Sequence, residues 1–195
     1  MKRIFDIVVS FSILMVFLPF GIIIAIIIFF TSKGGIFYVQ ERIGKDRKPF
    51  GLLKFRTMST NADKEGKLTV GMRDSRITKV GYYLRKYKLD EFPQFVNVLL
   101  GEMSVVGPRP EVNEYVELYT EDQLKVLKVK PGITDLASLE YFNENEILGN
   151  ADDPKKAYIE EVMPAKLELN KKYLENVSVL EDVKIMWKTF LRIIS

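Results

Sequence analysis

The sequence has no cysteine and no histidine among its 195 residues, and each absence excludes a class of site. Without cysteine the chain forms no disulfide, offers no thiolate nucleophile and supplies no sulfur ligand to a metal. Without histidine it lacks the commonest general base, the Ser–His and Cys–His catalytic pairs, and zinc sites of the usual kind. Any catalysis must therefore use carboxylates, lysine, tyrosine or an oxygen-bound cation such as Mg²⁺.

A large excess of charge is missing as well. The chain has 29 Lys and Arg against 26 Asp and Glu, which gives a formal net charge of only +3. This balance, together with the lack of an aromatic–basic groove pattern, argues against nucleic acid as a partner. The length suits one domain with a substantial core and an appendage.

The chain does contain one long apolar run, over residues 4–30, with few polar interruptions. A straight helix over this run would be roughly 40 Å long, enough to cross a bilayer. The run is too long for a cleaved signal sequence, and no small-x-small site follows it. Pro19 lies within it and predicts a kinked or broken helix, whose two arms are each shorter than the roughly 30 Å hydrocarbon layer.

Basic residues flank this run on both sides. Because cationic flanks favour the cytoplasmic side, a re-entrant helix–break–helix accommodates both flanks, whereas a straight span leaves one outside. The charges alone leave both geometries open. In either case we expect residues 1–32 to form a membrane anchor and residues 33–195 a separate folded domain. The flanking residues are Lys2 and Arg3 before the run, and Lys33, Arg42, Lys45, Arg47 and Lys48 after it.

The remaining sequence predicts an α+β domain that is mainly helical. A turn leading into a short strand is expected over residues 34–40, a strand over 50–58, and a mobile polar loop over 59–74. Apolar periodicity predicts helices over 75–88, 121–129, 157–173 and 180–194, with Ser75 as a candidate cap and an interruption near Pro164. A further helix is expected to begin near Pro93, with the acidic pair in its first turn, and to end before Gly101. Residues 133–139 are expected to form a turn and a short strand, and residues 143–153 an acidic loop.

The segment over residues 180–194 is amphipathic. An ordinary core-facing helix explains this pattern, and the alternative is an interfacial helix with Trp187 at headgroup depth and the cations on phosphates. Its apolar face comprises Val183, Met186, Trp187, Phe190, Leu191 and Ile194, with Lys184, Lys188 and Arg192 beside it.

Two adjacent carboxylates, Asp90 and Glu91, stand just before Pro93 and an apolar run that Gly101 ends. A carboxylate at a helix start is usually a cap, so the pair is expected in the first helical turn. Two arginines lie near this pair, Arg85 one turn upstream and Arg109 between two prolines. Their presence favours a phosphate-binding site over a purely structural cap.

Two further cations, Lys54 and Arg56, lie on the predicted strand over residues 50–58. Their ordinary explanation is a solvated strand face or contact with anionic headgroups, and the alternative is a contribution to the same phosphate site.

The order of these motifs resembles that of the bacterial sugar transferase family, the small monotopic phosphoglycosyl transferases, over nearly the whole chain. The residues that carry the resemblance are Lys54-Phe55-Arg56-Thr57-Met58, Gly81-x-x-Leu84-Arg85, Leu89-Asp90-Glu91-Phe92-Pro93-Gln94, Asn97-Val98-Leu99, Gly101-Glu102-Met103-Ser104, Val106-Gly107-Pro108-Arg109-Pro110 and Pro131-Gly132-Ile133-Thr134.

The resemblance implies an enzyme that transfers a sugar-1-phosphate from a UDP-sugar to undecaprenyl phosphate, releases UMP and initiates a surface glycan. It implies a re-entrant N-terminal helix, amphipathic interfacial helices and a catalytic domain on the cytoplasmic face of the bacterial plasma membrane. Asp90 would be the nucleophile, forming an aspartyl-phosphosugar intermediate, and would also bind Mg²⁺.

The other site residues have supporting roles in this prediction. Glu91 would position or deprotonate the acceptor phosphate or help hold the metal, and Arg85 and Arg109 would clamp phosphate oxygens. Lys54, Arg56 and Gln94 are further substrate-binding candidates.

The sequence departs from the family at Asp135-Leu136-Ala137-Ser138, where Gly and Gln often follow Thr134, and this leaves the identity of the sugar open. The alternative to an enzyme is a non-catalytic membrane scaffold that recruits other glycan-assembly enzymes. The acidic pair beside two arginines argues against it, because a scaffold does not need that arrangement.

Overall fold

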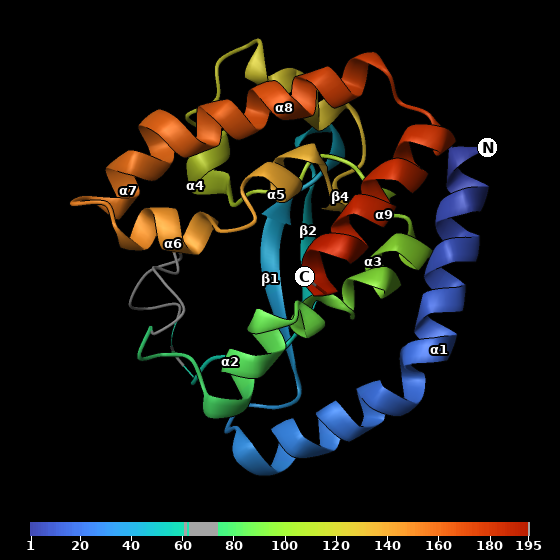
Figure 1. Ribbon diagram of the computed structural model, residues 1–195, viewed down its shortest axis with the longest axis vertical. Helices are drawn as coiled ribbons and strands as arrows, with labels where there is room; N and C mark the ends of the chain where they lie inside the picture. Colours follow the sequence, from blue (N-terminus) through green and yellow to red (C-terminus); the bar gives the residue numbers. More distant parts are fainter. Residues whose placement is uncertain (61, 63–73, 195) are drawn as a thin grey trace.

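A computed structural model describes residues 1–60, 62 and 74–194 of the chain, so most of the polar loop predicted over 59–74 lies outside the described residues. The prediction of a mainly helical α+β fold is confirmed (Figure 1). The strands are β1 (Phe37–Ile43), β2 (Pro49–Phe55), β3 (Ser104–Val106) and β4 (Gly132–Thr134). The α-helices are α1 (Lys2–Thr31), α2 (Lys79–Lys86), α3 (Gln94–Leu100), α4 (Asn113–Val116), α5 (Leu136–Glu140), α6 (Glu144–Gly149), α7 (Pro154–Ala157), α8 (Met163–Glu175) and α9 (Val179–Ile194). Short 3₁₀ turns are η1 (Lys45–Arg47), η3 (Leu89–Glu91) and η4 (Gln123–Lys128), and η5 (Tyr158–Val162) is a π-helical turn.

Strands β1 and β2 form an antiparallel hairpin that carries part of the site. The register pairs Tyr38 with Lys54 and Gln40 with Leu52. Asp46 and Arg47 have positive φ angles of 55° and 60° in the connecting turn. Since side chains alternate along a strand, this register places Tyr38, Gln40 and Lys54 on one face of the hairpin.

A second, parallel pair joins β3 to β4, and two glycines bring its flanking segments into contact. A Cβ at Gly132 would lie 2.1 Å from the Gly107 nitrogen, so a side chain at this position would overlap the neighbouring backbone. The Gly107 N–H donates to the Thr134 carbonyl at 3.0 Å, and the Gly132 N–H donates to the Pro108 carbonyl at 3.0 Å. This contact fixes the turn that carries Arg109.

The core is divided among these elements. One cluster joins β2, α3 and β3 to α8 and α9, with Val98 and Met103 fully buried at its centre. A second lies under α8, where Tyr115, Tyr158 and Leu167 pack together. The turn that carries Arg109 therefore joins the first cluster, at Val106, to the second, at Val112.

Helix α1 is continuous through Pro19, and its ribbon changes direction partway along (Figure 1). Its first arm is bonded to the folded domain: Arg3 donates to the Leu99 carbonyl at 3.0 Å, and Asp6 accepts from the Val105 N–H at 3.0 Å. In its second arm Ile28, 1% exposed, packs against the cluster formed by β2 and α2. Both ends of α1 thus contact the same domain.

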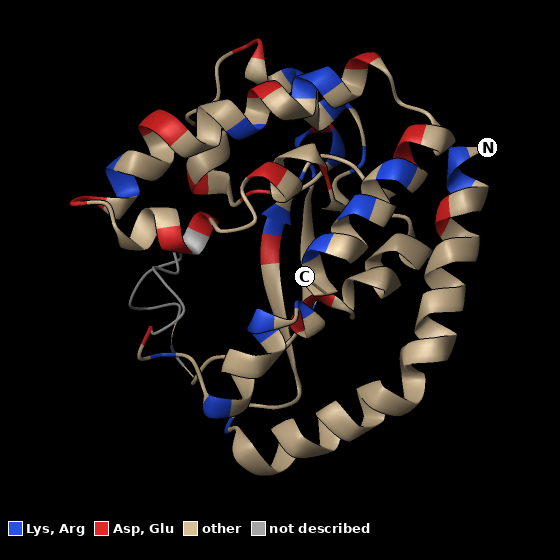
Figure 2. Ribbon diagram, in the orientation of Figure 1, with Lys and Arg blue, Asp and Glu red and all other residues tan. Residues whose placement is uncertain are grey.

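The surface of α1 suits lipid. Within the described residues it is the one helix long and apolar enough to cross a membrane by length and composition, and 6% of its most apolar window is buried. Charged residues are confined to its first turns (Figure 2). Exposed side chains as apolar as Val16 and Phe30, at 74% and 79%, are characteristic of a membrane-embedded surface rather than of one in water.

Four local predictions need correction. Helix α2 is capped by Thr78 rather than Ser75, and the Thr78 side chain accepts from the Gly81 N–H at 2.9 Å. The segment after β4 forms helix α5 rather than a strand, because the Asp135 side chain caps it. The acidic stretch over 143–153 contains α6, and the helix expected over 121–129 is the 3₁₀ helix η4.

The explanation of the last helix, α9, as an ordinary core-facing helix is wrong, because most of its apolar side chains are exposed. Trp187 is 60% exposed and Ile194 is 64% exposed. The buried residues of α9 are Asp182 and Ile185, which lie on the opposite edge. The pi-helical turn η5 and the start of α8 are consistent with the predicted interruption near Pro164, because proline cannot donate the next helical hydrogen bond.

Candidate active site

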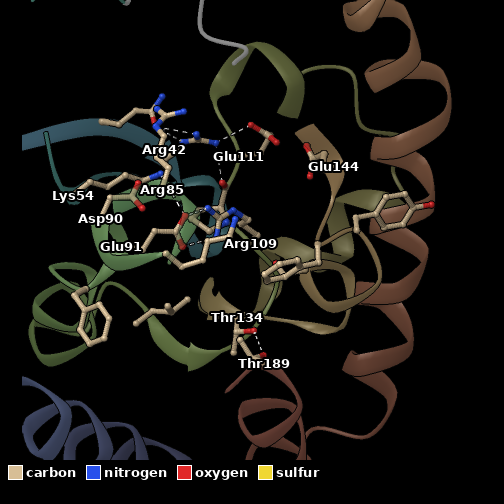
Figure 3. A pocket seen from close by; sticks show the side chains of 18 of the residues that line it. Arg42, Lys54, Arg85, Asp90, Glu91, Arg109, Glu111, Thr134, Glu144 and Thr189 are labelled. Atoms are coloured by element: carbon tan, nitrogen blue, oxygen red, sulfur yellow. Dashed lines mark hydrogen bonds and ion pairs between the residues drawn. The ribbon is translucent and has the colours of Figure 1, made fainter. Parts of the chain in front are cut away.

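A cavity of about 870 Å³ opens between the β1–β2 hairpin, η3, the turn of residues 108–111, α8 and α9. This volume falls in the range of sites that bind cofactor-sized ligands. Six of the seven residues predicted for the site line it, and all of these except Arg56 are labelled in Figure 3. These are Lys54, Arg56, Arg85, Asp90, Glu91 and Arg109.

The acidic pair lies in η3, directly before α3, and not in the first turn of an α-helix as predicted. Lys88 has a left-handed conformation with φ 55° and turns the chain from α2 into η3. Helix α3 begins after Pro93 and receives no side-chain cap. The pair therefore does not serve as a cap, which removes the ordinary structural explanation for it.

Glu91 is held by two cations. Both of its carboxylate oxygens accept from the Arg109 guanidinium, one of them from Nη1 at 3.1 Å, and Lys54 Nζ lies 3.9 Å from Oε1. Burial favours a higher pKa for Glu91, but the charges of Arg109 and Lys54 outweigh it and hold the pKa well below its usual range. Glu91 is thus an ionised, fully engaged carboxylate.

Asp90 differs from its neighbour. Its side chain is 7% exposed, and its carboxylate accepts no hydrogen bond from the described part of the chain. Burial and the adjacent Glu91 charge raise its pKa, while Lys54 and Arg85 oppose the rise. Within the described residues Asp90 is therefore a desolvated carboxylate near cations but without an ion-pair partner, and a buried group with a perturbed pKa in a cavity is a candidate for a chemical role.

Arg85 is placed by the contact between α2 and the end of β2. A Cβ at Gly81 would lie 2.1 Å from the Thr57 carbonyl oxygen, so only glycine permits this approach. Across it, Arg85 Nε donates to Thr57 Oγ1 at 2.9 Å. Burial lowers the pKa of Arg85, and Asp90 opposes that effect. The Gly81-x-x-Leu84-Arg85 motif thus has a geometric basis.

Lys54 projects from β2 toward the acidic pair. Its side chain is 16% exposed, and burial lowers its pKa to about 8, with Glu91 opposing the fall and Arg109 adding to it. The pKa of Arg109 shifts in the opposite direction, because the negative charge of Glu91 raises it. About a third of the Arg109 side chain is exposed. Its remaining N–H groups are available to a ligand in the cavity.

Two predicted residues are placed differently. Arg56 lines the cavity, but its guanidinium donates to the carbonyls of Gly35 at 3.0 Å and Phe37 at 3.1 Å and so fastens the start of β1. Gln94 is 1% exposed and does not line the cavity, and its Nε2 has no partner within the described structure. The structure therefore does not bring Gln94 to the other site residues.

The sequence did not identify the residues that hold Arg109 in place. The Arg109 N–H donates to Asp135 Oδ2 at 3.0 Å, and the same fully buried carboxylate accepts from Ser138 at the start of α5. Glu111 accepts from Arg42 at 2.9 Å and from the Tyr158 hydroxyl. The sequence did contain a signal for these two residues, because each is an acidic residue directly after a family motif: Glu111 follows Pro110, and Asp135 follows Thr134.

The donor set limits how a metal can bind. No group of three or more acidic residues suited to a metal occurs within residues 1–60, 62 and 74–194. Of the two central carboxylates, Glu91 is bound by cations, and Asp90 has no ion pair with any residue that the structure describes. Mg²⁺ commonly takes one carboxylate together with phosphate oxygens and water. The residues fit a magnesium ion that binds with a phosphate ligand, and they do not form a complete site by themselves.

Comparison with known proteins gives close relatives of this chain. It is 38% identical over 194 residues to the UDP-glucose:undecaprenyl-phosphate glucose-1-phosphate transferase of Klebsiella pneumoniae, covering 98% of this chain and 39% of that protein. It is 32% identical over 197 residues to the UDP-N-acetylgalactosamine-undecaprenyl-phosphate N-acetylgalactosaminephosphotransferase of Aeromonas hydrophila, covering 100% of this chain and 44% of that protein.

A shorter relative matches along most of its length. The exopolysaccharide production protein PSS of Rhizobium leguminosarum bv. phaseoli is 36% identical over 197 residues, which cover 97% of this chain and 92% of that protein. By contrast, the chain spans only about two fifths of the two longer transferases. The family model described as bacterial sugar transferase matches residues 1–195, and the chain belongs to that family.

Proposed function

We propose that this chain transfers a sugar-1-phosphate from a UDP-sugar to undecaprenyl phosphate and releases UMP. The observation that carries the proposal is a contrast between two neighbouring carboxylates. Asp90 is buried and has no hydrogen-bonded partner among the described residues, whereas Glu91 is bound by Arg109 and Lys54. Two carboxylates with different electrostatic environments in one cavity are suited to different roles. The names of the relatives supply the substrate classes.

In the first step an Asp90 carboxylate oxygen attacks the phosphorus that bears the sugar. The bond from that phosphorus to the bridging oxygen breaks, and UMP leaves with the electron pair, so an aspartyl-phosphosugar forms. Because the second pKa of a phosphate monoester is about 6, UMP leaves as an anion without protonation. A chain without histidine can therefore catalyse this step.

In the second step an oxygen of the acceptor phosphate attacks the same phosphorus. The acyl-phosphate bond breaks, Asp90 regains its carboxylate, and the product is a polyprenyl diphosphate sugar. Glu91 does not need to remove a proton, because a phosphate monoester is largely dianionic at neutral pH. Its role is to orient Arg109 and Lys54 toward the phosphoryl group.

The cations stabilise the charge that passes through the cavity. Arg85, Lys54 and Arg109 border the acidic pair, and each well-placed donor contributes on the order of 2–4 kcal/mol to the transition state. When bound, Mg²⁺ at Asp90 would offset the diphosphate charge and let an anionic nucleophile approach.

The contacts of α1 support a proposal for the membrane geometry. Its first arm is bonded to α3 and β3, and its second arm packs on β2 and α2, so both arms contact the same domain. These contacts favour a re-entrant helix, with the domain and the N-terminus on the cytoplasmic face. The exposed apolar side chains of α9 would then lie in the interface and set the depth at which the acceptor phosphate meets Asp90.

The decisive experiment uses Asp90→Asn, with Asp152→Asn as the matched control, since Asp152 is exposed and remote in sequence from the acidic pair. Protein, UDP-sugar and Mg²⁺ are mixed without acceptor, and the intact mass is measured after rapid acid quench. The parent chain and D152N should gain the mass of one phosphosugar and release UMP, whereas D90N should do neither. An unmodified parent chain that still forms lipid product would replace the two-step mechanism with direct displacement.

The scaffold alternative makes a different prediction. A scaffold would bind membranes normally and release no UMP from any UDP-sugar when polyprenyl phosphate and Mg²⁺ are supplied. A panel of purified UDP-sugars therefore separates the two functions and also identifies the donor.

A further inference from the structure

The cavity has two unlike sides. Along α9 it is lined by the apolar side chains of Met186, Trp187 and Phe190. Across from α9, in the region where Figure 3 shows Glu144 and Glu111, it is lined by polar side chains from η5, α6 and α8. The phosphoryl chemistry described above uses neither side.

Asn170 of α8 is the most informative residue on the polar side. It is 4% exposed and lines the cavity, and its Oδ1 has no hydrogen-bond partner within the described residues. Buried amides without a partner are rare, and each needs an explanation such as a ligand or a water. A separate cavity of about 20 Å³ also touches Asn170 and has room for about one water molecule, so both explanations can be tested.

An ion pair lies near Asn170 on the same side. Lys166 Nζ donates to Glu144 Oε2 at 2.6 Å, and the two side chains are 13% and 27% exposed. Lys166 also lies 5.8 Å from the centre of the Tyr158 ring. Because the pair is neutral overall, it does not compete with Arg109 and Lys54 for phosphate. It offers both a donor and an acceptor to a neutral ligand group.

The backbone at this point is unusual as well. Tyr158 begins the π-helical turn η5, and its hydroxyl is used by Glu111, so its ring is left as a wall of the cavity. Isolated π-helical turns occur often at functional sites, because they redirect side chains within a helix.

We propose that Asn170, Lys166 and Glu144 form the subsite for the uncharged, hydrogen-bonding end of the donor, and that the acceptor's isoprenoid chain occupies the α9 side. This rests on the proposed function. An isoprenoid chain has no donor or acceptor for Asn170, whereas both the uracil ring and the sugar of a UDP-sugar have them. Conversely, the apolar side chains of α9 offer little to a nucleotide sugar.

The test measures KM for donor and acceptor separately. Asn170→Leu preserves size and removes hydrogen bonding, and Lys166→Met removes the ion pair. Lys171→Met is the control, because Lys171 lies on the same helix and bonds to Asp122 and Glu168 outside the cavity. We expect N170L and K166M to raise the donor KM about tenfold, the scale of one buried hydrogen bond, with the acceptor KM within twofold. A raised acceptor KM would overturn the assignment.

Direct binding separates this inference from the proposed function. Affinities of UMP and of the UDP-sugar are measured by calorimetry on the parent chain, N170L and K171M. Weaker UMP binding by N170L places the nucleoside at Asn170, and weaker UDP-sugar binding alone places the sugar there. Unchanged affinities with a lower unfolding temperature would show that Asn170 is a structural residue bonded to water, even if turnover is normal. Binding that follows the prediction without turnover would refute the enzyme and leave the subsite intact.

Discussion

Lys54 gives the sharpest test of the electrostatics, because its charge is predicted to disappear within the working pH range. Burial lowers its pKa from 10.5 to about 8, despite the opposing charge of Glu91. The protonated form contributes to the phosphoryl site, so its loss above pH 8 should lower kcat/KM by up to tenfold for each further pH unit. Lys54→Arg keeps the charge at all these pH values and should move this alkaline limb above pH 10.

The assay is UMP release from the UDP-sugar between pH 6 and 10, at a fixed concentration of acceptor and Mg²⁺. Lys54→Met should show no alkaline limb, with a rate at pH 7 reduced roughly 30- to 1000-fold, which corresponds to 2–4 kcal/mol of lost stabilisation. An alkaline limb near pH 8 that survives in K54R would assign the titration to another group. A parent chain whose rate is constant to pH 9.5 would refute the burial argument itself.

Stability supplies an independent readout for the same residue. The unfolded chain binds more protons than the folded chain between pH 8 and 10.5, so the free energy of unfolding rises with pH in that window. Below pH 8 the full cost of protonating buried Lys54, roughly 3 kcal/mol, is present. K54M removes this cost and also one of the two cations around Glu91. At pH 7 we therefore expect it to unfold no more easily than the parent chain, although its activity is lost.

Three further predictions concern residues that position the site. Asp135→Ala removes the acceptor of the Arg109 backbone N–H and the cap of α5. It should lower the free energy of unfolding by about 2–3 kcal/mol and should also lower kcat/KM. A loss of kcat/KM without a loss of stability would contradict the capping role. Lys88→Gly places glycine where the backbone is left-handed, so it should not destabilise the fold. It also removes a positive charge that lowers the pKa of Asp90, so that pKa should rise further. In a pH–rate profile the acid limb of kcat/KM should therefore move to higher pH. Lys2→Met leaves the buried Asp182 without its cation and should cost about 3 kcal/mol in denaturant unfolding, with no shift in the pH profile.

The sequence predicted the parts of the site that depend on local chemistry. Asp90, Glu91, Arg85 and Arg109 do converge on one cavity, as their types and spacing indicated. Gly101 ends α3 with φ 89°, as expected of a residue after an apolar run. These predictions depended on backbone conformation and charge within a few residues, which a sequence contains directly.

The parts that were missed depend on contacts between distant segments. The pairing of Arg42 with Glu111 joins residues 69 positions apart, and Asp135 acts on a residue 26 positions earlier. Gln94 lies in the same motif as Asp90 but does not line the cavity. It is 1% exposed and begins α3, whereas Asp90 lies in the preceding 3₁₀ turn η3. A motif identifies which residues occur together, and only the packing decides which of them share a face.

The position of Asp90 is tied to the membrane helix through aromatic packing. Phe17, two residues before Pro19, stacks on Phe92 with ring centroids 3.7 Å apart, and Phe92 is two residues after Asp90. We therefore expect this contact to couple the depth of α1 in lipid to the position of Asp90. Under the proposed mechanism, an acceptor whose phosphate stays at the headgroup layer can attack the phosphosugar on Asp90 only if Asp90 lies at that height. A helix bonded to the domain at both arms keeps it there more rigidly than a flexible tether, since neither arm can move without disturbing the packing around η3.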